Sequence, residues 1–463
     1  MAAHRMNPMK IPELIQEIAA FVENARDLSQ LVQVDRFTNA AATPCLFRHI
    51  DITLDSVESL AATLRSNPER AVGCKSLSFH KSSNESAILL EARSLDQLST
   101  DLITVFNAIS AHGQLVTLRW RKNCRLHFGR YWIAFPENVW TAMSHVMIPL
   151  QELELCVNAR EMHIWGSITC LCFTQLRVFR IYLPDAGGWN CSDFQTMLDS
   201  LCDLEELSLV LSIYDGPRNI TLGSTYPHLR RFSFTSNAVF PASDFLLRHP
   251  KLEILFLEMD QVFHWPDPST HSALRILNID EHTLVSSPIV MNARIIHLRF
   301  RSSHLGSSVL LDTVRAVACT LRCLELEVYT PFEVGYAALL DAAPALVELG
   351  IICSASYRIP DWSTQVLCNL VSVLDPAAPL RALRLRHLRR EDDKLPVSFL
   401  NDLEGLDSFP PRLEYIGWDF VTTSLIYVIT KLGGKNSVSR TLTRSRIPED
   451  WTEENVLHYL EEY

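Results

Sequence analysis

LQELEL, residues 150–155, is the stretch of sequence that decides the fold. Its form, L-x-x-L-x-L, recurs in twelve copies whose starts lie 21 to 35 residues apart. Repeats of this length predict a solenoid, in which each copy is one structural unit stacked on the next. The copies are LVTLRW (115–120), LQELEL (150–155), LRVFRI (176–181), LEELSL (204–209), LRRFSF (229–234), LEILFL (252–257), LRILNI (274–279), IIHLRF (295–300), LRCLEL (321–326), LVELGI (346–351), LRALRL (380–385) and LEYIGW (413–418).

Each copy predicts one short buried strand. Alternate side chains of a strand point to opposite faces, so Leu153 and Leu155 face one layer. A single short strand cannot hide that layer, but stacked copies can. Helices between copies would close each coil, so the expected fold is α/β with a parallel sheet on the concave face. We predict helices at 56–67, 95–109, 194–201, 245–248, 309–317, 334–340, 366–374 and 397–403.

The chain begins with a different pattern, an apolar stripe at helical spacing between Lys10 and His49. Pro12 suits a first helical turn, because its missing N–H is not needed there. We expect a second helix to begin at Asp27, with Gln30 completing a capping-box-like pair. Three short helices cannot bury all these apolar side chains among themselves, so the rest of the chain or a partner must cover some of them. The apolar residues are Ile11, Leu14, Ile15, Ile18, Phe21, Val22, Leu28, Leu31, Val32, Val34 and Phe37.

This segment resembles an F-box. The matching positions are Ile11-Pro12, Glu13, Leu14, Ile18, Val22, Asp27-Leu28, Val34 and Phe37. CLFRHIDITL (45–54) resembles the short strand that often follows the F-box in fungal members. Ile11 replaces a leucine of the pattern, and Asp35 stands where cysteine is common.

The repeats resemble the degenerate leucine-rich repeats of fungal, basidiomycete-type F-box proteins. Only Asn158 fits the asparagine or cysteine position of that pattern, so we expect an irregular solenoid. The resulting division is an F-box-like module at 1–54, a repeat solenoid at 55–432, and a polar linker with an acidic C-terminal helix at 433–463.

The resemblance implies a non-catalytic adaptor of a cullin–RING (SCF-type) ubiquitin ligase. Its F-box would dock to a Skp-type adaptor, and its repeats would hold a protein substrate whose identity the sequence does not give. The alternative is a stand-alone leucine-rich-repeat scaffold whose N-terminal helices only cap the solenoid. The docking residues implied are Ile11, Pro12, Leu14, Ile15, Ile18, Val22, Leu28 and Leu31.

Two groups of residues are candidates for binding the substrate. Arg384 and Arg386, with Arg389 just beyond, lack obvious partners on the next strand and would suit acidic or phosphorylated targets. A solvated basic edge is an equally good interpretation. Trp189 and Trp265 follow repeat strands and could anchor a partner at the rim of the solenoid, although tryptophan more often fills space under a loop.

Charged residues on the opposite strand face predict ladders across neighbouring strands. They are Arg119–Glu154–Arg180, Arg299–Glu325 and Asp280–Arg301–Glu327. Parallel neighbours lie about 4.8 Å apart, so residues in register can pair. We favour mutual neutralisation on a solvated face, where each pair is worth about 0–1 kcal/mol, over a docking surface for a target.

Composition argues against several other classes of protein. The net charge of −11 disfavours nucleic acid, so we expect the basic and aromatic residues of 119–140 to belong to an insertion packed on the solenoid. We expect no signal peptide, no membrane span and no homo-oligomer, and a cytoplasmic or nuclear location. The 12 scattered cysteines suggest reduced thiols, and no metal, cofactor or catalytic motif is expected.

Overall fold

The computed structural model describes two compact units, residues 1–229 with 236–240 and residues 230–235 with 241–463. The residues described are 11–22, 25–80, 95–121, 135–147, 149–157, 173, 175–183, 191–211, 222–236, 239–259, 272–281, 294–302, 305–328, 335–353, 366, 369–370, 373, 378–387, 412–419, 424–432 and 435–441.

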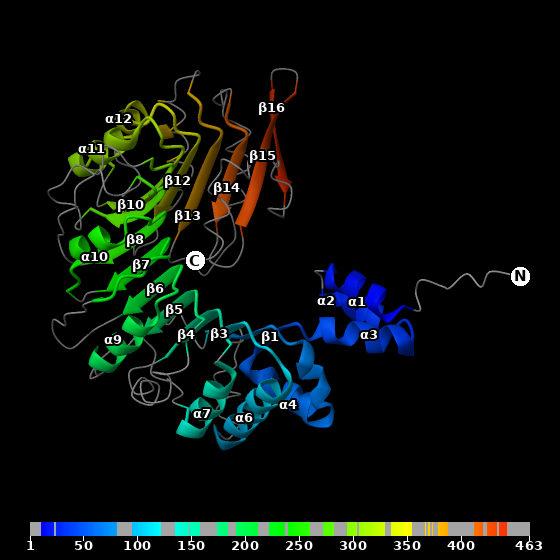
Figure 1. The fold of residues 1–463 in the computed structure, drawn as a ribbon. Coiled ribbons are helices and arrows are strands. Elements are labelled where there is room, and N and C mark those ends of the chain that lie inside the picture. The colour runs from blue at the N-terminus through cyan, green and yellow to red at the C-terminus, as the bar shows by residue number, and fades with distance from the viewer. Residues whose placement is uncertain are drawn as a thin grey trace, which may run out of the picture. The chain divides into compact units, whose positions relative to one another are not determined.

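The first unit begins with a helical module, residues 11–48. It consists of α1 (Pro12–Ala20), α2 (Ala25–Val32) and α3 (Arg36–Leu46), and both α1 and α2 pack against α3 (Figure 1). Pro12 occupies the first turn of α1, as predicted. The prediction for α2 was wrong by two residues, since the helix begins at Ala25. Asp27 lies in its first turn, where a carboxylate favours the positive end of the helix dipole.

Asp35 forms the N-cap of α3, because its Oδ1 accepts a hydrogen bond from the backbone N–H of Thr38 at 2.7 Å. We expect Asp35→Ala to destabilise α3 by about 1 kcal/mol, the usual effect of losing such a cap. Hydrogen exchange of the α3 amides measures this effect. Asp35→Asn is the control, because asparagine caps a helix equally well. Equal exchange in the alanine and asparagine variants would contradict the capping role.

Six parallel strands follow the module in the first unit, ordered as in the chain. The predicted strand at 45–54 is confirmed from His49 onward, whereas Cys45 and Leu46 complete α3. The strands are β1 (His49–Thr53), β2 (Ser76–His80), β3 (Thr117–Arg121), β4 (Glu152–Cys156), β5 (Val178–Leu183) and β6 (Glu206–Leu211).

The second unit continues the same arrangement. Its strands are β7 (Arg231–Ser236), β8 (Ile254–Met259), β9 (Ile276–Asp280), β10 (His297–Ser302), β11 (Cys323–Val328), β12 (Glu348–Cys353), β13 (Ala382–His387) and β14 (Tyr415–Asp419). Neighbouring strands from β8 to β14 pair in parallel. Each of the twelve sequence copies therefore supplies one strand, β3 to β14, which confirms the predicted stacking.

The same backbone hydrogen-bond pattern recurs at the start of these strands. The carbonyl of Val116 accepts hydrogen bonds from two successive amides of the next repeat, Gln151 at 2.9 Å and Glu152 at 3.1 Å. The carbonyl of Arg322 does the same for Val347 and Glu348. Each such carbonyl thus accepts from two amides at the point where the one-to-one parallel pairing of the two strands begins. The other acceptors are Arg48, Lys75, Gln151, Arg177, Arg230, Glu253, Arg275, Ile296, Val347 and Arg381.

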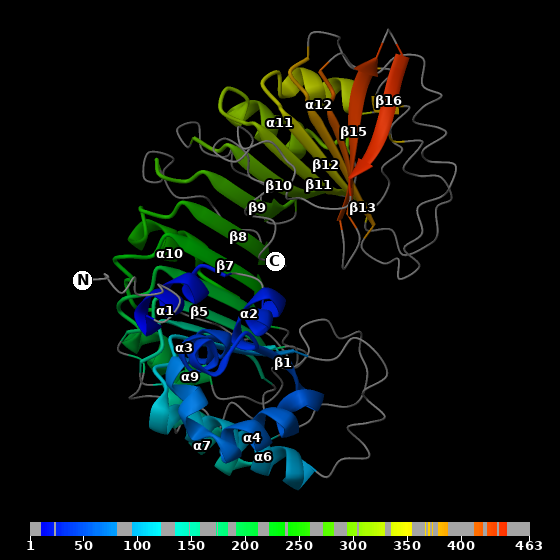
Figure 2. The same cartoon turned by 90° about the vertical axis from the view of Figure 1, so that its right-hand side faces the viewer.

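Helices connect the strands of both units (Figures 1 and 2). The first unit has η2 (Leu54–Ser56), α4 (Val57–Ser66), η3 (Pro68–Gly73), α6 (Leu95–His112), α7 (Glu137–Met147) and α9 (Cys191–Ser200). The second has α10 (Ala242–Arg248), α11 (Ser308–Val317) and α12 (Tyr336–Ala342). The helices predicted between 56 and 340 are confirmed, and α7 was missed. Of 366–374 only Val366, Asn369, Leu370 and Val373 are described, all helical, and 397–403 lies outside the described residues.

The leucines of the repeats form the core, as predicted. Leu153 and Leu155 are fully buried, and so are Leu324 and Leu326 in the second unit. The basic and aromatic insertion contributes to this core. Trp120 of β3 lies 5.0 Å from the ring of Phe79 and 6.2 Å from that of Trp140. The described aromatic side chains, Trp120, Phe135 and Trp140, therefore pack on the repeats, as we expected. Residues 122–134 lie outside the described part.

The end of the chain differs from the prediction of a polar linker beginning at residue 433. The described part of the second unit ends in an antiparallel hairpin, β15 (Ser424–Leu432) and β16 (Lys435–Thr441), and β15 pairs with β14. A polar stretch can form a strand where a neighbour satisfies its backbone hydrogen bonds, and β15 does so for β16. The expected acidic helix near residue 450 lies outside the described residues.

Candidate functional site

Helix α1 and its N-cap residue Ile11 carry one apolar stripe that is buried along one edge and exposed along the other. The buried edge carries Ile15 and Ala19, each only 1% exposed. The exposed edge carries Ile11 and Ile18, which are 37% and 41% exposed, and Leu14, whose exposure is intermediate. The spacing of 11, 14 and 18 places these residues along one side of the helix. The exposed stripe, Ile11–Leu14–Ile18, thus adjoins the edge of α1 that packs on its own module, and the described part of the chain does not cover it fully.

Two of the residues that the F-box resemblance assigned to docking, Ile15 and Leu28, are buried in the core of the module. Ile15 and Leu28 pack with Ala19, Ala41 and Ala42, and Leu28 is only 5% exposed. Val22 and Leu31 are partly buried against the same cluster. Their side chains hold α1, α2 and α3 together, so Ile15 and Leu28 do not face a partner in this conformation. The available docking residues reduce to Ile11, Pro12, Leu14 and Ile18.

Three further apolar side chains of the module are exposed. Phe21, directly after α1, is 86% exposed, while Val34 and Phe37 at the start of α3 are 63% and 39% exposed. Burying such side chains is favourable by about 25 cal/mol per Å² of apolar surface. The helical module therefore keeps apolar surface that a second polypeptide could cover.

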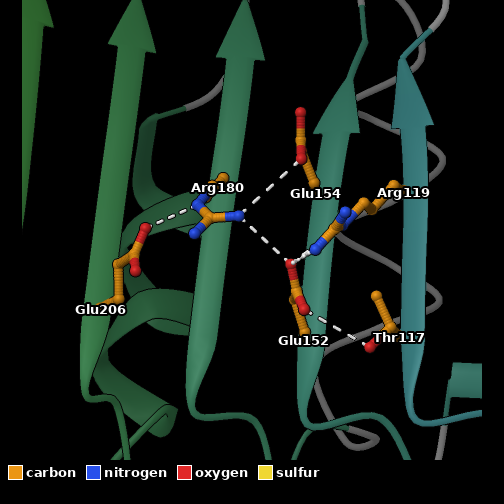
Figure 3. A network of polar contacts seen from close by, with 6 residues as sticks. All are labelled: Thr117, Arg119, Glu152, Glu154, Arg180 and Glu206. Carbon is orange, nitrogen blue, oxygen red and sulfur yellow. Dashed lines mark hydrogen bonds and ion pairs between the residues drawn. The ribbon is translucent and has the colours of Figure 1, made fainter. Parts of the chain in front are cut away.

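The opposite strand face of the first unit carries a polar network. Arg180 of β5 lies between carboxylates of two strands (Figure 3). Its Nε donates to Glu206 Oε1 at 2.5 Å, and its Nη1 lies 3.2 Å from Glu152 Oε1 and 4.0 Å from Glu154 Oε2. Arg119 of β3 approaches the same Glu152 oxygen, with Nη2 at 2.9 Å. The ladder thus runs Arg119–Glu152–Arg180–Glu206.

This network corrects the predicted solvated ladder in two ways. First, Arg119 meets Glu152 rather than its register partner Glu154, because long side chains lean along the strand. Second, the centre of the network is not solvated, since Glu154, Arg180 and Glu206 are 3%, 8% and 4% exposed, whereas the side chains of Arg119 and Glu152 are 36% and 20% exposed. Burial alone would lower the pKa of Arg180, but the hydrogen bond and charge of Glu206, with Glu152 and Glu154, outweigh it and raise that pKa. The guanidinium stays charged and is neutralised by its own chain.

The second unit repeats this arrangement. Arg301 of β10 pairs with Glu327 of β11, with Nε 3.0 Å from Oε1, and also contacts Glu258 of β8. The predicted pair of Arg299 and Glu325 has its closest described approach at 4.0 Å, and Arg299 also reaches Glu327 at 3.6 Å. Glu325 and Glu327 are each 5% exposed. The two glutamates of β11 are therefore buried, whereas the side chains of Arg301 and Glu258 are 37% and 45% exposed.

Arg384 corrects the prediction that it has no partner. Its Nη1 lies 3.4 Å from Glu348 Oε1 on the preceding strand, β12, and the side chain is 13% exposed. On the following strand, β14, Gly417 occupies the register position opposite Arg384 and cannot pair with it. The basic edge is therefore neutralised at this residue. The side chain of Arg386, and all of Arg389, Trp189 and Trp265, lie outside the described part of the chain.

A surface hollow of about 370 Å³ lies at the N-terminal ends of strands β4 to β6. Its lining is polar, and two of the lining residues, Arg177 and Glu205, approach each other to 3.5 Å. Nothing in this arrangement indicates a catalytic group. The lining residues are Gln151, Gln175, Arg177, Asp203, Glu205 and His228.

Over the residues that the structure describes, no group of three or more histidine, cysteine or acidic side chains could hold a metal ion. None of the described helices is both long enough and apolar enough to span a membrane. No protein-family model matches the chain, and no curated protein matches it in sequence. The fold and surfaces together define an α/β repeat protein that carries a helical module with an exposed apolar face.

Proposed function

We propose that this chain is the substrate-recognition adaptor of a cullin–RING ubiquitin ligase. Its module would act as an F-box that docks to a Skp-type adaptor, and its array would act as degenerate leucine-rich repeats that hold a protein substrate. The observation that carries the proposal is that the apolar stripe of α1 is only partly covered. Ile15 and Ala19 hold the module together, while Ile11 and Ile18, next to them on the same side of the helix, stay exposed. A helix that only capped a solenoid would turn a polar face outward.

In this function the chain itself makes and breaks no bond. Two binding surfaces on one protein bring a substrate lysine close to a ubiquitin-charged enzyme held elsewhere in the complex. Holding the reactants together turns a bimolecular encounter into an effectively unimolecular step. The proposal therefore needs two separable surfaces. The exposed stripe Ile11–Leu14–Ile18 is the first, and the repeat array supplies the second.

Binding of a recombinant Skp-type adaptor to the full chain tests the first surface. Replacing both Ile11 and Ile18 by alanine is expected to weaken binding roughly tenfold or more, since truncating two buried apolar anchors costs about 1 kcal/mol or more each. The matched control is Val72→Ala in η3, because Val72 is 55% exposed and lies outside the module. Isothermal titration calorimetry measures the affinity. Undiminished binding by the double variant would reject these anchors.

A stand-alone repeat scaffold is the second candidate function. The observation that favours it is the close approach of η3 to α3, where Gly73 meets the backbone of Pro44. Such a contact suits a module that caps the array. Deleting residues 1–48 separates the two functions. A cap deletion will lower the unfolding temperature of the first unit, whereas a docking-module deletion will leave that temperature unchanged and abolish adaptor binding.

A further inference from the structure

His297 occupies an unusual position on the strand face opposite the leucine core. It begins β10, and its register neighbours are Ile276 on β9 and Cys323 on β11. The next strand continues this row with Glu348. His297 is only 2% exposed, although it lies on the face where the charged residues gather.

Its ring makes no hydrogen bond within the part of the chain that the structure describes, and both Nδ1 and Nε2 are buried. Glu325 Oε2 lies 4.0 Å from Nε2, which is too long for a hydrogen bond. A buried polar atom without a partner costs about 1–3 kcal/mol. The site therefore holds a neutral ring. Glu325 Oε2 is itself buried without a hydrogen-bond partner, but at 4.0 Å it lies beyond hydrogen-bond distance of a protonated ring.

The surrounding charges point the same way. Burial lowers the pKa of His297 to about 4; Glu325 opposes this shift, and Arg384 and Arg299 add to it. Burial, together with Glu348 and Glu325, raises the pKa of the Cys323 thiol, which stays neutral. From β9 the facing residue is the uncharged Ile276. The ring is neutral in the fold at neutral pH.

We propose that His297 is an acid-sensitive lock on β10: a proton added to its ring finds no acceptor within hydrogen-bond distance and loosens β10 from β9 and β11. The inference does not depend on the proposed function, because it concerns only the packing of the second unit. Its consequence would be that mild acid opens the middle of that unit's charged strand face before the rest of the chain unfolds.

The direction of the pH effect follows from linkage. The unfolded histidine takes up its proton near pH 6.5, whereas the folded one does so only near pH 4. The stabilisation is complete above about pH 6.5 and is lost as the pH falls toward 4. Between about pH 7 and about pH 5 the equilibrium for opening at His297 should therefore rise about twentyfold.

Peptide-resolved hydrogen–deuterium exchange on the full chain, corrected for intrinsic rates, measures this opening. In the wild type, peptides covering 294–302 and 321–328 should lose protection by about that factor between the two pH values. Peptides covering β5, which contains no histidine, should not. His297→Gln should remove most of the pH dependence at β10 and β11, whatever its effect on absolute stability.

His228→Gln is the matched control, because it removes an exposed histidine of the first unit and should leave β10 unchanged. Wild-type β10 and β11 peptides whose protection stays constant between the two pH values would overturn the proposal. So would a His297→Gln variant that keeps the full loss. If His297→Gln does not fold, the wild-type comparison of β10 with β5 decides by itself.

Discussion

Arg180→Met will lower the free energy of unfolding of the first unit by about 3–5 kcal/mol, the usual effect of removing one partner of a buried ion pair. Methionine replaces the volume of the arginine stem but leaves Glu206, Glu152 and Glu154 without the cation that neutralises them. Glu154 and Glu206 are almost fully buried, so water cannot replace that cation. Urea unfolding followed by circular dichroism measures the loss.

Arg177→Met is the matched control for this result. Arg177 directly precedes the same strand and also approaches a glutamate, Glu205, but the two side chains are 59% and 48% exposed. An exposed pair of this kind contributes about 0–1 kcal/mol. If both variants lost the same stability, the network would behave as a solvated ladder and the argument from burial would fail. Adding Glu206→Gln to Arg180→Met should recover part of the loss.

Gly73→Val will displace α3 and destabilise the first unit by about 3 kcal/mol, at the upper end of what overpacking usually costs. A Cβ at residue 73 would lie 2.2 Å from the carbonyl oxygen of Pro44 and 2.9 Å from its carbonyl carbon. These are backbone atoms of a helix, so no side-chain rotation relieves the clash. Urea unfolding gives the energy, and hydrogen exchange of α3 locates the change.

Gly223→Ala is the control for this second result. The atoms nearest to a Cβ at Gly223 belong to the Asp199 carboxylate, 3.9 Å away, which is an ordinary contact. Its expected effect is within about 0.5 kcal/mol. Normal exchange of α3 in Gly73→Val would mean that η3 moves instead, and that the contact with Pro44 does not fix the module.

Several features of the fold could be predicted from the sequence because they depend on local periodicity. Strand alternation fixed which side chains face the core, and Leu153 and Leu155 are buried accordingly. Helical spacing found α1 and its apolar stripe. The sequence could not separate Ile15 from Ile18, since both belong to the stripe and only packing against α3 distinguishes them. Ala41 and Ala42 pack against Ile15 and Leu28 and complete the module core. The spacing of apolar residues along the sequence did not predict that contact.

The candidate site was less predictable. Charged residues at alternating positions predicted ladders between register partners. The pairs that form depend also on the direction in which each long side chain extends and on the space around its charged end. Arg384 pairs with Glu348 on the preceding strand, and Arg119 pairs with Glu152 instead of its register partner Glu154. The sequence did not predict that the ring of His297 is buried without a hydrogen bond, because a histidine in a strand can equally well face the solvent.

The sequence by itself determined the repeat, the alternation of its strands and the helical start of the chain, because these depend on spacing along one polypeptide. Only the tertiary structure decided which charged groups are buried, which apolar side chains of the module remain exposed, and that residues 435–441 form a strand. The physical reason is that burial and hydrogen-bond partners depend on neighbours brought close by folding. Residues as far apart as Glu258 and Arg301 meet only after the strands have stacked.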